Sequence, residues 1–129
     1  MTSLREHVHS DAVIIGNRLA HHSVSKVCGV LGLGTRQMIS LPVSHDMSVN
    51  IEKMRESLED CKLNNKTVLA IGALAGSTGC GSFGAIAAIA ALTKEFGAWP
   101  HLDGAWGASL TFSPQVQETL FAGVHVADP

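Results

Sequence analysis

The sequence predicts an α/β fold in which helices sandwich a mostly parallel sheet. Short apolar segments alternate with segments of helical periodicity, which gives four predicted strands and three predicted helices in strict alternation. Strands joined through helices run parallel, because each crossover returns the chain to the same end of the sheet. The almost uninterrupted apolar run over residues 67–75 is typical of a central parallel strand that is covered on both faces.

Two strand–helix pairs are predicted in the first half of the chain. The β-branched run over residues 12–16 predicts the first strand, and residues 23–33 predict a helix that ends in glycines. Residues 37–43 predict a second strand that ends at a proline. Residues 49–61 carry apolar side chains on one helical face and charges on the other, which predicts an amphipathic helix.

The second half of the chain repeats this order. The strand over residues 67–75 leads into a glycine- and serine-rich loop, and an alanine- and isoleucine-rich helix over residues 83–96 follows, with Gly97 suited to end it. The next strand ends at Asp103, and residues 114–120 predict a short last helix. Because ligands of open parallel sheets bind outside the carboxyl ends of the strands, Asp103 is a candidate ligand-binding residue.

Pro100 lies within the segment that leads to Asp103. Proline lacks a backbone N–H group and is normally excluded from central strands. The strand is therefore expected either to begin after Pro100 or to pair weakly at that position.

The composition indicates one globular domain. The 129 residues are 46% apolar, with a formal net charge of -2. The nine lysine and arginine residues form no basic run and aromatic residues are few, so no nucleic-acid partner is expected. No apolar stretch approaches the roughly 20 residues of a membrane-spanning helix, and residues 1–10 lack the apolar core of a signal peptide. We therefore expect no membrane partner and a cytoplasmic location.

The cysteines and histidines do not form a convincing metal-binding pattern. Cys28, Cys61 and Cys80 are odd in number and include no Cys-x-x-Cys pair, so each is expected to be a reduced thiol that fills the core. His7, His9 and Asp11 have the strand spacing of a metal tripod, but no second ligand cluster accompanies them. No metal is expected.

The glycine-rich loop offers one functional hypothesis. Gly79 to Gly84 spell G-x-G-x-x-G between a predicted strand and helix, and Asp103 lies 19 residues beyond Gly84, as in Rossmann-type dinucleotide-binding domains of oxidoreductases. Two details oppose this reading. Three residues separate the strand from the first glycine, and about 65 residues of other structure come first, whereas the fingerprint usually opens its fold.

Three sequence blocks, taken in order, resemble a known family. Residues 20–26 read AHHSVSK, residues 75–83 read AGSTGCGSF, and residues 99–113 begin WPHLDGAWG. Together they resemble the pyridoxal-phosphate-dependent group II decarboxylases, which act on glutamate, aromatic amino acids and cysteine sulfinate. The third block is similar to that family's Trp-Leu-His-Val-Asp-Ala-Ala-Trp-Gly-Gly. The resemblance implies that residues 1–129 are a fragment of the cofactor-binding large domain of a fold-type-I enzyme.

The resemblance also implies roles for four residues toward pyridoxal phosphate. Asp103 matches the carboxylate that keeps the pyridine nitrogen protonated, so that the ring can act as an electron sink. His21 matches the catalytic histidine that stacks on the ring, and Thr78 matches a hydroxyl that contacts the cofactor. Ala105 would pack near the ring.

Three of these residues also have a structural explanation. His21 precedes a predicted helix, where a histidine is usually a surface or capping residue. Thr78 could satisfy backbone groups of its own turn, and Asp103 could pair with a helix N-terminus.

The chain departs from the family pattern at several points. Gly84 replaces an acid, Gly104 replaces the first alanine of Asp-Ala-Ala, and Ala108 replaces the second of the paired glycines. The Schiff-base lysine of the family would follow the stretch that resembles Ala127-Asp128, and all five lysines here precede Asp103. The resemblance thus implies an L-amino acid decarboxylase, a homodimer at full length, whose fragment is expected to be inactive alone. A non-catalytic degenerate paralogue is an alternative.

Overall fold

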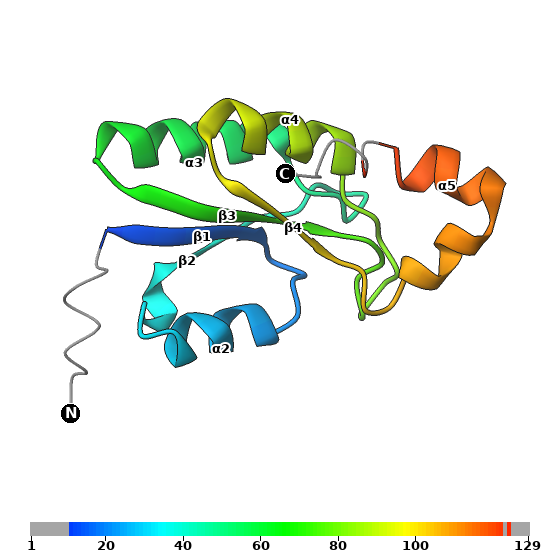
Figure 1. The fold of residues 1–129 in the computed structure, drawn as a ribbon, viewed down its shortest axis with the longest axis horizontal. Helices are drawn as coiled ribbons and strands as arrows, with labels where there is room; N and C mark the ends of the chain where they lie inside the picture. The colour runs from blue at the N-terminus through cyan, green and yellow to red at the C-terminus, as the bar shows by residue number, and fades with distance from the viewer. Residues whose placement is uncertain (1–10, 123, 125–129) are drawn as a thin grey trace.

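A computed structural model describes residues 11–122 and residue 124 (Figure 1). The elements occur in the predicted alternation, with two short 3-10 helices added. In chain order they are β1 (Ala12–Asn17), α2 (Ser23–Val30), η1 (Thr35–Gln37), β2 (Met38–Leu41), α3 (Ile51–Leu63), β3 (Thr67–Leu74), α4 (Ile86–Phe96), β4 (Trp99–Asp103), η2 (Ala108–Phe112) and α5 (Pro114–Leu120).

The four described strands form one sheet in the order β2-β1-β3-β4, and every neighbouring pair is parallel. The predicted α/β class is therefore confirmed. Leu74 pairs with Asp103 at the ends of β3 and β4, so the loops that follow these strands leave the sheet at the same edge. Figure 1 shows these loops side by side beyond the arrowheads.

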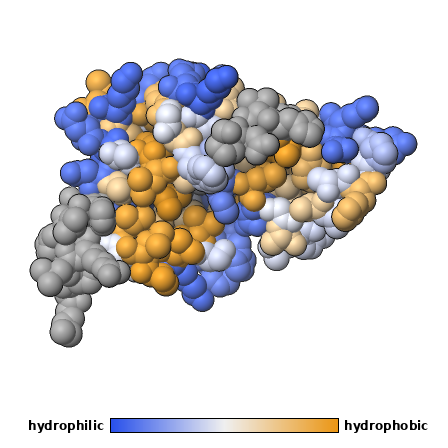
Figure 2. Space-filling view, viewed as in Figure 1, coloured by the Kyte–Doolittle hydropathy of each residue, from blue (hydrophilic) through white to orange (hydrophobic). Residues whose placement is uncertain are grey.

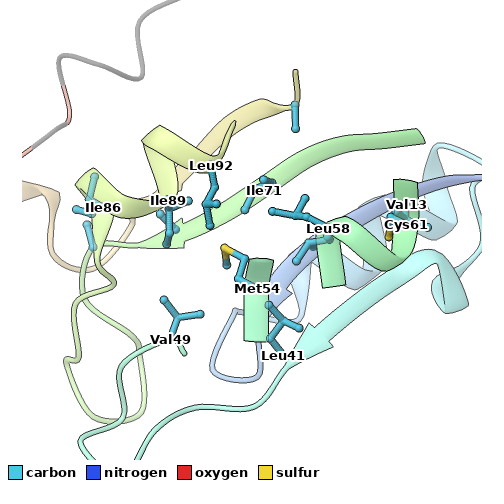
Figure 3. Close-up of a cluster of buried hydrophobic side chains, with 14 of the residues drawn as sticks. Val13, Leu41, Val49, Met54, Leu58, Cys61, Ile71, Ile86, Ile89 and Leu92 are labelled. Carbon is cyan, nitrogen blue, oxygen red and sulfur yellow. The ribbon is translucent and has the colours of Figure 1, made fainter. Parts of the chain in front are cut away.

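The main core lies between the sheet and helices α3 and α4, which cover one face together (Figure 1). The fully buried side chains here include Ile15 and Ile71 from the strands and Met54 and Leu58 from α3. Figure 3 labels Ile71, Met54 and Leu58 in this cluster. Periodicity explains this packing, because residues four apart on α3 share the face that meets the sheet. A smaller cluster of Ala12, Cys28 and Leu33 joins α2 to the opposite face.

The prediction that β3 is buried on both faces is wrong for the described residues. Ala70 and Gly72 are only half-buried, and Leu69 is 42% exposed. On the α2 side of the sheet, Ala70, Gly72 and Trp99 line an apolar hollow of about 310 Å³ together with α2. Figure 2 shows apolar side chains gathered over α2 and the neighbouring strands. The run is apolar and β3 is central among the described strands, yet on its other face the main core fully buries only the later residues Ile71 and Ala73.

Pro100 is accommodated within β4. The strand begins at Trp99, one residue earlier, and Pro100 pairs with Ile71 of β3. Among the described strands β4 is at the edge of the sheet, where a missing N–H group on the outer side costs no ladder hydrogen bond. The expectation that the strand begins after Pro100 is therefore wrong.

The helix limits differ from the predicted ones where the chain makes tertiary contacts. The helix expected from residue 83 begins at Ile86, because Phe83 bridges Ala75 and the Gly84 amide donates to the carbonyl of Leu74 over 2.7 Å. Its end is as predicted, since Gly97 adopts a φ of 68° as the left-handed cap.

His7 and His9 lie outside the described residues. The longest described helix, α3, has 13 residues, and no helix in the described part of the chain has the length and apolarity to cross a bilayer.

Candidate active site

A hollow of about 220 Å³ opens at the carboxyl edge of the sheet. The structure brings all four predicted site residues to its wall, although they come from three separate segments of the chain. His21 follows β1, Thr78 follows β3, and Asp103 with Ala105 comes from the end of β4. The hollow lies where open parallel sheets bind ligands.

Asp103 is the last residue of β4 and is half-buried. Its Oδ1 accepts a hydrogen bond of 3.3 Å from the backbone N–H of Ala105, an Asx-type contact within the turn. Among the described residues no cationic side chain forms an ion pair with this carboxylate. Asp103 therefore shapes its own turn through one oxygen and retains acceptor capacity toward the hollow.

His21 lies on the segment between β1 and α2, with its ring exposed at the hollow. Its Nδ1 accepts a hydrogen bond of 3.3 Å from the backbone N–H of Ser23 and lies 2.9 Å from the Ser23 hydroxyl oxygen. The backbone donor selects the neutral tautomer that carries its proton on Nε2. His21 therefore has the expected structural role in addition to its place at the hollow, because its ring accepts a hydrogen bond from an amide in the first turn of α2.

His22 stacks obliquely beside His21, with 4.0 Å between the ring centroids. The neighbouring His21 lowers the pKa of His22, and Lys26 lowers it further. A positive charge on His22 is thereby disfavoured.

Thr78 lies in a turn that is closed by its neighbours. The Ser77 amide donates to the carbonyl of Ser82 over 2.9 Å, and the Gly81 amide donates to the carbonyl of Ser77 over 2.8 Å. The hydroxyls of Ser77 and Ser82 lie 3.0 Å apart. The exposed Thr78 hydroxyl has no hydrogen bond within the described part of the chain, so it does not serve its own turn there.

Cys80 does not fill the core as expected. Cys28 and Cys61 are buried, and burial raises the pKa of both thiols, but Cys80 is exposed in the same turn as Thr78. Its Sγ lies 3.0 Å from the hydroxyl oxygen of Ser77. Hydrogen bonding, chiefly from Ser77, lowers the pKa of the Cys80 thiol.

Six of the ten residues that line the hollow were not predicted as site residues, and two of these six have side chains that bear on the predicted ones. Ser23 contacts His21, and its position two residues after the histidine was the available signal. Trp106 forms part of the wall although it is 58% exposed, and the sequence offered only its place beside Ala105. None of the described residues that line the hollow is a lysine.

The glycine fingerprint does not have dinucleotide-binding geometry. Helix α4 begins at Ile86, two residues after Gly84, so the last glycine does not open the helix. The amides of Gly81 and Ser82 already bond to the carbonyl and hydroxyl of Ser77. A pyrophosphate needs such amides to be free at a helix N-terminus, which these are not.

Comparison with known proteins decides between the two hypotheses. The family model described as the pyridoxal-dependent decarboxylase conserved domain matches residues 3–129. The chain belongs to this family. The resemblance stated from the three sequence blocks is thus confirmed, and the Rossmann alternative is not favoured.

Curated relatives are amino acid decarboxylases by name. The chain is 34% identical over 108 residues to L-aspartate decarboxylase dtxS4 of Metarhizium robertsii. The matched region covers 84% of this chain and 21% of that protein. It is 30% identical over 108 residues to glutamate decarboxylase of Drosophila melanogaster, with the same two shares. The chain therefore spans about a fifth of the length of these relatives.

Solved structures share the fold. Mouse CSAD in apo form superposes with a TM-score of 0.88 at 24% identity, over 95% of this chain and 26% of that one. The glutamate decarboxylase domain of a Vibrio parahaemolyticus protein gives a TM-score of 0.87 at 26% identity, over 92% of this chain and 26% of that one. The family uses pyridoxal phosphate, and the residues of the hollow fit that cofactor, because Asp103 offers acceptor capacity without a competing ion pair.

Proposed function

We propose that the hollow holds the pyridine ring of pyridoxal phosphate and that the chain is the central segment of the large domain of an L-amino acid decarboxylase. The convergence of Asp103, His21, Thr78 and Ala105 carries this proposal. The four residues come from three separate segments of the described chain, and all of them line the hollow at the carboxyl edge of the sheet. If each residue had only a structural role, nothing would require all four to line the same hollow.

Asp103 holds the proton of the ring nitrogen in this proposal. A carboxylate beside a pyridinium stabilises its charge and raises the affinity of the nitrogen for its proton. When bound, pyridoxal phosphate supplies an electron sink for the charge that remains on the substrate carbon after carbon dioxide leaves. Asp103 is half-buried at the end of β4, where solvent screens this interaction less than at an open surface.

His21 fixes the plane of the ring by stacking on its face. A flat imidazole on the ring face would hold the plane of the pyridine, to which a substrate bond could then stand perpendicular as it breaks. Because Ser23 bonds to Nδ1, the neutral imidazole has its proton at Nε2. Thr78 donates or accepts a hydrogen bond at the ring edge, and Ala105 leaves room for the ring where a larger side chain would intrude.

The full-length protein is proposed to be a cytoplasmic homodimer that binds a small-molecule amino acid substrate. The resemblance to the family supports these statements. Residues 1–129 alone are proposed to be inactive, because no lysine lines the hollow in the described part of the chain. Incubation of this chain with pyridoxal phosphate and L-aspartate, L-glutamate or L-tryptophan should release no carbon dioxide, and sustained release would contradict the proposal.

Binding of pyridoxine 5′-phosphate tests the site directly. This probe has no aldehyde, so it cannot form adducts with the five lysines on the surface. Isothermal titration should show binding by the wild-type chain, and Asp103→Asn should weaken it by about tenfold or more, as expected for loss of a hydrogen bond to a charged group.

Asp60→Asn is the matched control, because Asp60 is an exposed acid on α3, away from the hollow. Its affinity for the probe should equal that of the wild type. Equal affinity of wild type and Asp103→Asn would contradict the role of Asp103. The same titration with NADH should show no binding, in contrast to the dinucleotide alternative.

A further inference from the structure

Trp106 lies across the glycine turn that carries Thr78. A Cβ atom placed on Gly76 would come within 2.8 Å of Cε3 of Trp106, and one on Gly81 would lie 3.5 Å from its Cζ3. The indole therefore contacts both ends of the turn. Gly76 and Gly81 have positive φ angles of 87° and 67°, which suit glycine, and their missing side chains make room for the ring.

The turn that carries Thr78 is bonded within itself. Hydrogen bonds between Ser77 and Ser82 close it from within, and Thr78 projects beyond them. Thr78 therefore has no anchor of its own in the described part of the chain, and its position depends on what holds the whole turn.

The loops after β3 and β4 are interlocked beside the indole. The Ala75 amide donates to the carbonyl of Asp103 over 2.9 Å. A Cβ atom on Gly107 would lie only 2.2 Å from the carbonyl oxygen of Ala75, so the two backbones are as close as glycine allows. Trp106 thus lies on the short loop that follows Asp103, and its side chain packs against the turn that carries Thr78.

We propose that Trp106 is a positioning residue, which sets the place of the Thr78 hydroxyl relative to the Asp103 carboxylate. This inference rests on the proposed function, because it concerns how the two groups reach one bound ring. Trp106 acts through Thr78 in this proposal and need not touch the cofactor. Packing of the indole against the turn holds Thr78 in place, because Thr78 has no hydrogen bond of its own in the described part of the chain.

Hydrogen exchange tests the structural half of the proposal without any ligand. Trp106→Ala should speed exchange of the Gly81 and Ser82 amides, which close the turn, and Trp106→Phe should restore most of the protection by leaving an aromatic ring against Gly76. Trp99→Ala is the matched control, since Trp99 is 55% exposed at the opposite end of β4. Unchanged exchange in Trp106→Ala would overturn the proposal.

A double-mutant cycle with pyridoxine 5′-phosphate tests the functional half. Trp106→Ala should weaken binding by about tenfold, and the same substitution in a Thr78→Ala background should have little further effect, because coupled residues do not act additively. Trp99→Ala should leave the affinity unchanged.

The outcomes separate this inference from the proposed function. Independent, multiplicative losses from Trp106→Ala and Thr78→Ala would overturn the positioning role while leaving the cofactor site intact. Absence of binding by the wild type would contradict the proposed site, and the hydrogen-exchange comparison would still decide whether Trp106 holds the turn.

Discussion

Nδ1 of His21 lies 2.9 Å from the hydroxyl oxygen of Ser23 and accepts a hydrogen bond from the backbone N–H of the same residue. Ser23 is the first residue of α2, so the orientation of the imidazole is tied to the start of a helix. The pair explains how an exposed histidine on a connecting segment can have a defined ring plane and tautomer.

Ser23→Ala should loosen the ring of His21. The backbone donor remains, but loss of the hydroxyl removes one of the two contacts to Nδ1, so the tautomers should become more mixed in nitrogen NMR spectra. Affinity for pyridoxine 5′-phosphate should fall about two- to tenfold, the range for one neutral hydrogen bond.

Ser25→Ala provides the control for this prediction. Ser25 lies on the same helix, and its hydroxyl donates to the carbonyl of His22 rather than to a side chain of the hollow. Both the tautomer ratio of His21 and the affinity should match the wild type. A tautomer ratio unaffected by Ser23→Ala would show that the backbone donor alone is sufficient.

Gly107→Ala should destabilise the fold at the site. The added Cβ would lie 2.2 Å from the carbonyl oxygen of Ala75 and 2.9 Å from Cζ of Phe83, and a backbone atom cannot rotate away. Urea unfolding should show a loss of about 1–3 kcal/mol, as for other overpacked positions. Gly79→Ala, whose new Cβ would meet nothing within 4 Å, should change stability little. Equal losses in both variants would exclude steric overlap as the cause.

Much of the fold was predictable because its signals are local. Alternating periods predicted the parallel strands, and an acid at a strand end predicted that Asp103 would face a hollow. Pro100 could not be placed from the sequence, because whether a strand is central or at the edge depends on its neighbours. Likewise, the start of α4 at Ile86 depends on the contacts of Phe83 and Gly84 with β3 and its end.

The site was predictable only as a set of residues. The order of the three blocks indicated His21, Thr78 and Asp103, but no spacing rule shows that they line one hollow. Nor could the sequence indicate that Trp106 leans on Gly76, since this contact joins two loops separated by a helix and a strand. Contacts of this kind depend on tertiary packing. A glycine allows them because its missing side chain leaves space for the neighbouring ring.

Cys80 should be the reactive thiol of the described chain. It is exposed and its pKa is lowered, chiefly by the Ser77 hydroxyl, whereas burial raises the pKa of Cys28 and Cys61. With an aromatic disulfide reagent, one thiol should react quickly and two only after unfolding. The pH midpoint of the fast phase should lie below that of a free cysteine, because the thiolate is the nucleophile.

Two variants check the assignment of the fast thiol. Cys80→Ser should remove the fast phase entirely. Ser77→Ala should move its midpoint to higher pH, since the largest stabilisation of the thiolate is then lost. A fast phase that survives in Cys80→Ser would mean that one of the buried cysteines becomes accessible in the native state.

Leu58→Ala should test whether the core between the sheet and α3 stabilises the chain. Leu58 is fully buried beside Ile71, whereas Leu63 on the same helix is 83% exposed, so the pair separates burial from helix propensity. Urea unfolding followed by circular dichroism should show a loss of about 2–5 kcal/mol for Leu58→Ala. The loss for Leu63→Ala should be within about 0.5 kcal/mol. If Leu58→Ala is unfolded without urea, Ile71→Val should give a measurable loss of about 0.5–1.5 kcal/mol. Equal stabilities of the Leu58→Ala and Leu63→Ala variants would contradict the packing of Leu58 in the core, because only Leu58→Ala should leave a cavity.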